Sequence, residues 1–191
     1  MLRFLIVCLA ACALAGCTSV LPARPAADAL YRLGPLEPTY AAQASITIRE
    51  PEASRLFSGR FMVTEDETGA VRLIRSVQWT DRATSLMQEA VLDLLSGQGG
   101  NVAIAIPGGA PTEFELAWRI SDMSIRGQTA RCRIEASLLR GPQRELSGQR
   151  SISVTAQASG GSDAARALAL VEAGRACARE TAAFIASVAA D

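Results

Sequence analysis

Histidine and lysine are absent from the 191-residue chain, and all 19 basic residues are arginine. Histidine is the usual general base near neutral pH, so its absence excludes a Ser-His-Asp triad, a Cys-His pair and histidine-ligated zinc. Without lysine there is no Schiff-base chemistry, no Ser-Lys pair and no Gly-Lys-Ser/Thr phosphate loop. Catalysis by carboxylates alone is the remaining enzymatic route. We predict no enzymatic activity, no cofactor and no metal site.

Neither sign of charge is in excess, because 19 acidic residues balance the 19 arginines. A nucleic-acid-binding surface needs clustered basic residues, and no such run occurs, so we expect no nucleic-acid partner. Long apolar runs are also missing after the N-terminal segment, since no later stretch reaches the roughly 18 consecutive apolar residues of a transmembrane helix. The folded part of the chain is therefore predicted to lie in water.

The N-terminal segment has the pattern of an export signal. Arg3 supplies a positive charge, and residues 4–15 are uniformly apolar or small. This stretch is shorter than the about 20 residues that span a bilayer, but it fits the apolar region of a secretory signal. It ends in Leu14-Ala15-Gly16-Cys17, which resembles the bacterial lipobox, where the signal is cut before a cysteine that carries acyl chains. We predict a lipoprotein signal peptide over residues 1–16 and lipidation of Cys17. The alternative is a plain secretory signal with an incidental cysteine.

Lipidation of Cys17 would fix the protein to a membrane. Each buried methylene contributes about 0.8 kcal/mol, so one acyl chain holds only marginally, whereas two or three chains such as palmitate hold almost permanently. Thr18 and Ser19 follow the cysteine, and in the sorting pattern that accompanies the lipobox the absence of aspartate there favours the outer membrane. Residues 17–29 are rich in alanine and proline and are predicted to be the lipid anchor and a flexible tether. We expect the folded part to face the periplasm.

Two of the five cysteines are left for the folded part. Cys8 and Cys12 lie in the predicted signal peptide, and Cys17 is the lipidation site. Cys132 and Cys177 fall on positions assigned to the core, one on a strand and the other on the last helix. In an oxidising compartment they can form a disulfide, which would contribute about 3–4 kcal/mol in the chain-entropy description. Two buried thiols that never meet are the equal alternative.

Periodicity predicts both helices and strands. Apolar residues recur every three or four positions over 83–95, and again from Ser162 or Asp163 to about Ala189, as in amphipathic helices. Alternation of apolar and polar residues is typical of antiparallel strands with one wet face. The predicted strands are 46–48, 56–63, 71–79, 102–106, 114–120, 130–138 and 146–155. We therefore predict one α+β domain over residues 30–191, a largely antiparallel sheet with two main helices packed on it.

Charged residues outside the predicted core are the candidates for chemistry. Acidic residues at 65–67 lie in a predicted hairpin turn, and the Glu113/Glu115 pair lies on the wet face of a strand. These could serve as acid and base, but carboxylates at such positions are ordinarily solvated, so no catalytic residue is predicted. Arg131 and Arg133 share a strand face and can bind lipid phosphates, although pairing with Glu135 and its neighbours is the expected arrangement.

Several short motifs together resemble a known family. The lipobox and tether are followed by Tyr31-Arg32-Leu33 and a pair of strands. Trp79-Thr80-Asp81 then leads into the amphipathic helix over 83–95, with Asp81 as its predicted N-cap, and an alanine-rich helix comes last. This order is similar to the ABC-type transport auxiliary lipoprotein component family, which includes the lipoprotein of the paraquat-inducible intermembrane transport system.

The resemblance implies a non-enzymatic partner of an ABC transport system that carries mammalian-cell-entry (MCE) domains. Such systems move phospholipids or other hydrophobic molecules between the inner and outer membranes. The lipoprotein would stand on the outer membrane and dock the periplasmic part of the apparatus, with an MCE-domain protein and ABC transporter components as partners. A homo-oligomer is left open. The alternative function is that of a structural or assembly lipoprotein in another envelope complex.

Overall fold

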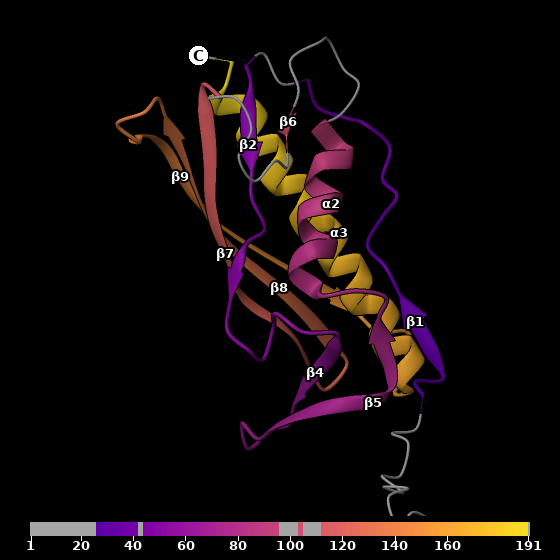
Figure 1. Ribbon diagram of the computed structural model, residues 1–191. Coiled ribbons are helices and arrows are strands. Elements are labelled where there is room, and N and C mark those ends of the chain that lie inside the picture. Colours follow the sequence, from indigo (N-terminus) through magenta and orange to yellow (C-terminus); the bar gives the residue numbers. More distant parts are fainter. Residues whose placement is uncertain (1–25, 42–43, 96–102, 105–111, 191) are drawn as a thin grey trace, which may run out of the picture.

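Alternating residues in the second half of the sequence form the longest strands of the protein (Figure 1). The computed structural model describes residues 26–41, 44–95, 103–104 and 112–190. The predicted signal peptide, Cys17 and most of the predicted tether lie outside these ranges. The strands are β1 (Ala29–Tyr31), β2 (Ile46–Ile48), β3 (Glu52–Ala53), β4 (Phe61–Glu65), β5 (Val71–Trp79), β6 (Ala103–Ile104), β7 (Phe114–Arg126), β8 (Thr129–Arg140) and β9 (Glu145–Gln157), and the helices are α2 (Ala83–Leu95) and α3 (Asp163–Val188).

The described strands form one nine-stranded sheet whose longest ladders are antiparallel. Strands β7, β8 and β9 make a meander, in which Met123 pairs with Cys132 and Cys132 pairs with Val154. Strands β4 and β5 form an antiparallel hairpin. Shorter parallel contacts join β2, β3 and β4 to β7, β2 to β6, and β1 to β5. The predicted α+β class with a largely antiparallel sheet is confirmed.

Strand β8 shows how the sequence pattern sorts residues between the two faces of the sheet. Its buried positions face the helices and are Ala130, Cys132, Ile134, Ala136 and Leu138. The polar positions alternate with them and face away from the helices; they are Arg131, Arg133, Glu135 and Ser137. Because side chains alternate across a strand, one periodic pattern builds both the core face and a helix-free face.

Strand β7 is longer than the predicted strand over 114–120, because it continues to Arg126. The register of its pairing with β8 shifts between Ile120 and Asp122. Such a bulge interrupts the alternation that identifies a strand in a sequence. Beyond it, Met123 returns to the buried face, while Asp122 and Ser124 pair with arginines of β8.

The last helix forms almost as predicted. Ser162 is the N-cap of α3, since its Oγ accepts a hydrogen bond from the Ala165 backbone N–H at 3.2 Å. The small residues on its buried stripe allow a close approach to the sheet. A Cβ added at Gly174 would lie 2.8 Å from Leu33 Cδ2 and 3.2 Å from Met123 Cε, so a larger residue here would require these buried side-chain ends to shift.

Helix α2 has the predicted bounds, but its N-cap differs from the prediction. The Arg82 carbonyl accepts the first helical hydrogen bond, from the Leu86 N–H at 3.0 Å. Arg82 is therefore the cap residue, and Asp81 lies one position earlier, where its carboxylate accepts from the Arg82 N–H at 2.6 Å. The Glu50 carboxylate accepts from the hydroxyls of Thr84 and Ser85 in the first turn.

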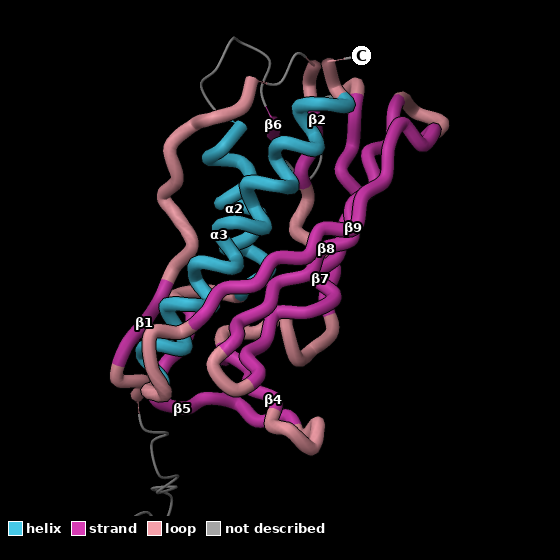
Figure 2. Tube along the Cα trace, turned by 180° about the vertical axis from the view of Figure 1, so that it is seen from behind, coloured by secondary structure: helices cyan, strands magenta, loops and turns pink. Residues whose placement is uncertain are grey.

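The two helices lie on the same side of the sheet. Helix α3 packs on β8 and β9, and α2 lies beside α3 (Figures 1 and 2). Helix α2 also contacts strand β2 of the sheet, since Gln88 Nε2 donates a hydrogen bond of 2.8 Å to the Ile48 carbonyl. The predicted packing of two helices on the sheet is confirmed. Neither helix has the length and apolar character needed to cross a membrane, as far as the described residues show.

One predicted strand begins too early. The prediction placed a strand over 56–63, but β4 begins at Phe61. Residues 54–58 instead form a turn closed by the N–H groups of Phe57 and Ser58, which both donate to the Ser54 carbonyl. The apolar Leu56 and Phe57 imitate a strand in the sequence, although they lie half-buried on this turn. Of the predicted strand over 102–106, only Ala103–Ile104 are described, and they form β6.

Candidate functional site

The predicted anchor leads into the folded part beside strand β5. The Asp28 backbone N–H donates a hydrogen bond of 2.8 Å to the Ser76 carbonyl. The next residues form β1, which pairs in parallel with β5 from Ala29 opposite Val77 to Tyr31 opposite Trp79. Cys17 itself lies outside the described residues. Ten residues lie between Cys17 and Asp28, so the chain that carries the predicted lipid leads to the β1–β5 edge.

The two motifs that carry the family resemblance meet at this edge. Tyr31 lies opposite Trp79, and its carbonyl accepts a hydrogen bond of 2.8 Å from the Thr80 N–H. Trp79 is 1% exposed and belongs to the core. Trp118 is also buried, and its Nε1–H donates to the Arg49 carbonyl at 2.8 Å. The motifs therefore specify a structural junction between the entering chain and helix α2.

The candidate carboxylates on the strands bind arginines. Glu65 accepts from Arg126 and, at 2.9 Å, from Arg131 Nη2. Glu115 lies 3.2 Å from Arg49 Nε and 2.7 Å from Arg144 Nη1. Each of these carboxylates thus contacts two guanidinium groups, which are the donors best matched to a carboxylate. The arrangement suits Glu65 and Glu115 to ion pairing.

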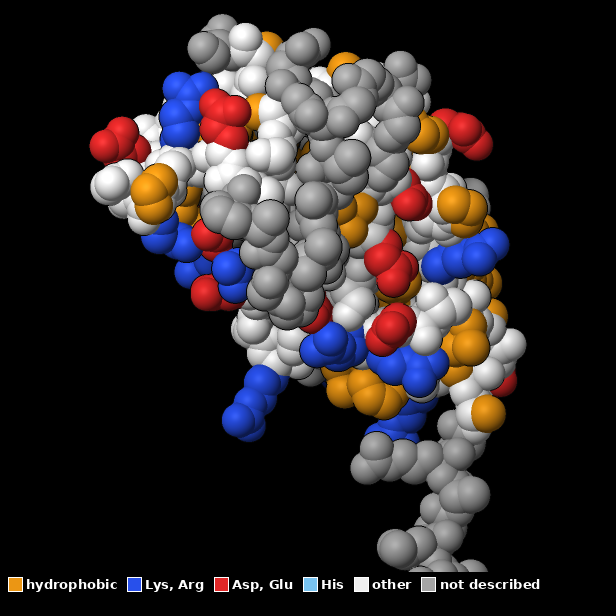
Figure 3. Space-filling model, turned by 45° about the horizontal axis from the view of Figure 1, so that its top comes forward, with side chains coloured by type: hydrophobic (Ala, Val, Ile, Leu, Met, Phe, Trp, Pro, Cys, Tyr) orange, Lys and Arg blue, Asp and Glu red, His pale blue; other side chains and the backbone are white. Residues whose placement is uncertain are grey.

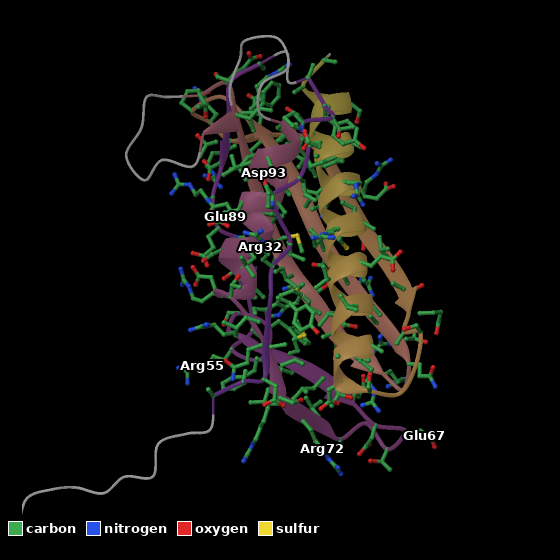
Figure 4. All side chains as sticks on the ribbon, turned by 90° about the vertical axis from the view of Figure 1, so that its right-hand side faces the viewer. Arg32, Arg55, Glu67, Arg72, Glu89 and Asp93 are labelled. Atoms are coloured by element: carbon green, nitrogen blue, oxygen red, sulfur yellow. The ribbon has the colours of Figure 1, made fainter. Side chains whose placement is uncertain are left out.

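Asp66 has a structural role in the β4–β5 turn. Its Oδ1 accepts from the Thr68 hydroxyl at 2.6 Å and from the backbone N–H groups of Thr68 and Ala70 at 3.0 Å. These hydrogen bonds lower the pKa of the Asp66 carboxyl, the Thr68 hydroxyl most strongly. Glu67 follows at the exposed tip of the same hairpin (Figure 4). These contacts confirm the predicted turn.

Arg131 and Arg133 lie on the helix-free face, as predicted from the strand pattern. Arg131 is paired with Glu65, and its Nε lies 3.4 Å from Asp122 Oδ2. The expectation of pairing with carboxylates is confirmed for Arg131, but Glu135 is not its partner, because Glu135 binds Arg119 Nε at 2.8 Å.

A groove of about 400 Å³ opens on this face. Its charged lining comes from Glu65, Asp122, Arg131, Arg133 and Glu135, and its apolar lining from Leu56, Phe57, Val63 and Val71. Carboxylates outnumber arginines in the lining, which disfavours an anionic ligand. Among the described residues, no three histidine, cysteine or acidic side chains are grouped so that they could hold a metal ion.

The two body cysteines come together in the core. Cys132 of β8 and Cys177 of α3 are both 0% exposed. Both are thiols, and Cys177 Sγ–H donates to the Cys132 carbonyl at 3.2 Å. The neighbouring Cys177 thiol and burial raise the pKa of Cys132 well above the ordinary thiol value. The structure therefore brings the two cysteines into contact. A disulfide between them stays a prediction.

Comparison with known proteins identifies the family. The description "ABC-type transport auxiliary lipoprotein component" matches residues 31–186, which is most of the chain. The chain belongs to this family. The match begins at Tyr31, the last residue of β1, and it includes α2, nearly all of α3 and all the long strands. Members of this auxiliary lipoprotein family are components of ABC-type transport and are associated with the cell envelope.

Two solved structures share the fold of this auxiliary lipoprotein. One is a protein from Xanthomonas campestris of the DUF330 family, with 16% sequence identity and a TM-score of 0.72, over 83% of this chain and 95% of that one. The other is an uncharacterized protein with 15% identity and a TM-score of 0.64, over 83% of this chain and 99% of that one. No curated protein matches the chain significantly.

Proposed function

We propose that this auxiliary lipoprotein is anchored in the outer membrane and docks the periplasmic part of an MCE-type ABC transport system without catalysing a reaction. The observation that carries the proposal is the family match over residues 31–186, preceded by the lipobox-like sequence at Cys17. The transported molecules would be phospholipids or other hydrophobic compounds. The partners would be an MCE-domain protein and the ABC transporter components, whose ATPase supplies the energy.

The charged residues support a binding role. An arginine lies beside each of Glu65, Glu113 and Glu115. For Glu113 this is Arg140, whose Nη2 lies 3.6 Å from Glu113 Oε1. Asp66 serves the fold, because the hydrogen bonds that lower its pKa are those of the β4–β5 turn.

The outer-membrane assignment rests on the residues after Cys17. Thr18 and Ser19 stand where aspartate would favour retention at the inner membrane. The first test is therefore membrane fractionation of the full chain and of three variants. The normal chain should appear in the outer-membrane fraction with acyl chains on Cys17, detected by intact mass. Thr18→Asp should move the acylated protein to the inner-membrane fraction.

Cys17→Ser removes the acylation site, and Cys12→Ser in the signal peptide is its matched control. We expect Cys17→Ser to lose acylation and signal cleavage together, whereas Cys12→Ser should be processed normally. A processed Cys17→Ser protein that still sediments with membranes would contradict the lipoprotein assignment. Normal outer-membrane sorting of Thr18→Asp would contradict the sorting argument alone.

The transport role is tested by identifying the binding partners of the protein and the genes beside its own. Chemical cross-linking in cells followed by purification should recover an MCE-domain protein, and recovery should fall with Cys17→Ser, because the domain is no longer held at the membrane. Genes for an ATPase, a permease and an MCE-domain protein should lie beside the gene for this chain. Recovery of an unrelated envelope-assembly complex, without any MCE-domain protein, would favour the structural alternative.

A further inference from the structure

The exposed large hydrophobic side chains are unevenly distributed over the described part of the protein. Leu30, Val71, Leu73 and Leu168 are 46–57% exposed, and they lie on β1, on β5 and near the start of α3. Hydrogen bonds hold these three elements together at one end. Asp28 N–H donates to the Ser76 carbonyl at 2.8 Å, and Ser76 Oγ–H donates to Asp163 Oδ2 at 2.6 Å.

Figures 1 and 2 show β1, the β4–β5 hairpin and the start of α3 at the lower end of the molecule. We call the surface formed by Leu30, Val71, Leu73, Leu168, Arg55 and Arg75 the anchor-end face. The first described residues, from residue 26 on, enter the fold at this same end. The apolar side chains therefore lie where the chain from Cys17 arrives.

Arginines accompany the apolar side chains at this end. Arg55 and Arg75 are exposed and form no ion pair with any described carboxylate. Arg72 binds Asp66 at 3.5 Å. Figure 3 shows hydrophobic side chains next to arginines at the lower end, and Figure 4 shows Arg55 projecting from it. Two exposed acidic side chains also lie at this end, Asp28 just before β1 and Glu67 at the hairpin tip.

We propose that the anchor-end face binds the lipid surface to which Cys17 is attached, with Val71 and Leu73 entering the boundary between headgroups and acyl chains and Arg55 and Arg75 contacting lipid phosphates. The occupant is an anionic lipid bilayer. The inference rests on the proposed lipid anchor. It adds that the domain does not swing freely on its tether but lies with one defined end on the membrane.

The short connection makes even a weak contact effective. Ten residues separate Asp28 from Cys17, and the chain from one to the other spans at most about 40 Å when fully extended. A connection this short gives an effective concentration on the order of millimolar. Each cationic side chain near an anionic surface adds further attraction, and each buried apolar group adds more. A contact that would be too weak for a free protein is thereby occupied most of the time.

The opposite end provides a matched control. Leu146 is the remaining exposed large hydrophobic side chain in the described residues, at 61%, and lies at the start of β9 beside the β8–β9 hairpin. In Figure 1 this hairpin is at the upper left, far from β1 and the β4–β5 hairpin. Leu146 is as apolar as Leu73 and more exposed, at 61% against 46%, but our proposal leaves it in water.

The test places a tryptophan at each end of the full acylated protein. Val71→Trp, Leu73→Trp and Leu146→Trp are each reconstituted in vesicles of phosphatidylethanolamine and phosphatidylglycerol with and without brominated acyl chains. The unsubstituted protein gives the background from Trp79 and Trp118, which are both buried. We expect brominated lipid to quench the new fluorescence at Val71 and Leu73 and to leave that at Leu146 unchanged. Because all three positions are exposed, each variant should fold, and thermal unfolding checks this.

The arginines are tested separately. Arg55→Gln with Arg75→Gln should reduce quenching of the Leu73→Trp reporter in phosphatidylglycerol vesicles, with little change in vesicles of zwitterionic lipid. Arg150→Gln with Arg179→Gln, which replaces exposed arginines of β9 and α3 outside the anchor-end face, should have no effect. Equal loss of quenching in both double variants would overturn the phosphate contact.

Each other outcome has a definite meaning. Absence of quenching at both Val71→Trp and Leu73→Trp in acylated protein overturns the inference but leaves the lipoprotein function intact. A blue shift of these reporters that is the same with and without vesicles, and without quenching, overturns it in favour of a second copy or a protein partner on this face. A protein whose intact mass shows no acylation at Cys17 overturns the proposed function and this inference together.

Discussion

The cysteine pair in the core gives a prediction whose magnitude follows from the structure. We predict that Cys132 and Cys177 form a disulfide in the protein made in an oxidising compartment. The two residues are 45 positions apart, so the bond would close a loop for which the chain-entropy description gives about 4 kcal/mol of stabilisation. This bond would tie helix α3 to the centre of the sheet.

The burial of both thiols determines when the bond can form. A thiolate, not a thiol, attacks another disulfide, and the raised pKa of Cys132 disfavours the thiolate in the folded protein. The bond should therefore form during folding, when the chain exchanges with a disulfide donor that leaves as a dithiol. Once folded in reducing conditions, the protein should react only slowly with oxidised glutathione.

The assay compares chemical unfolding with and without reductant. The native protein should lose about 4 kcal/mol on reduction, and its non-reduced mass should be about 2 Da below that of the reduced form because two hydrogens are lost. Cys177→Ala is the matched control, because it has no bond to lose. Its unfolding should be the same in both conditions, with a cost of about 1 kcal/mol from the small cavity.

A protein refolded with oxidised glutathione that keeps both thiols and unfolds alike with and without reductant would refute the reasoning. A disulfide that forms but changes the free energy of unfolding by less than about 1 kcal/mol would refute only the entropic magnitude. The two results are distinguished by the intact mass.

Three further outcomes are expected. In reduced protein, the raised pKa of Cys132 means that the folded state keeps a proton that the unfolded chain releases, so urea stability should fall between about pH 8 and pH 10, and disulfide formation should abolish this fall. Gly174→Ala should cost about 1 kcal/mol net, because overpacking against Leu33 Cδ2, 2.8 Å from the new Cβ, outweighs the helix propensity that alanine gains, whereas Gly160→Ala meets nothing within 4 Å and should be neutral in thermal unfolding. NMR titration should find the pKa of Asp66 below its ordinary value. The carboxylate stabilises the β4–β5 turn, and this stabilisation should be lost as pH falls through the lowered pKa. Asp66→Asn should reduce the protection of the turn amides from hydrogen exchange at neutral pH.

Local periodicity was enough to predict the helices and the long strands. The stripe of apolar residues over 83–95 is repeated every helical turn, so it identifies α2 without knowledge of its neighbours. Strand β8 alternates without interruption and was predicted almost completely. Strand β7 was predicted only as far as its bulge at Ile120–Asp122, because a bulge changes the period and leaves no local signal.

Sequence patterns do not predict which strands pair in parallel or which charged residues form ion pairs. Glu65 was recognised as a charged residue near a turn, but its partners Arg126 and Arg131 lie 61 and 66 positions away. The resemblance motifs at Tyr31 and Trp79 were noted as separate signals, although they pair directly across β1 and β5. Such pairs depend on register and topology, which no window of neighbouring residues contains.

The amino-acid sequence by itself determined what chemistry is available, because a chain without histidine or lysine lacks the usual bases and nucleophile partners wherever it folds. It also determined the lipobox-like signal at Cys17 and the positions of both helices, since these depend on adjacent residues. Only the tertiary structure decided which distant residues meet. It placed Cys132 against Cys177 and brought the exposed apolar side chains of β1, β5 and α3 to the end where the anchor chain enters. These contacts arise from strand register and helix packing, which are properties of the whole fold.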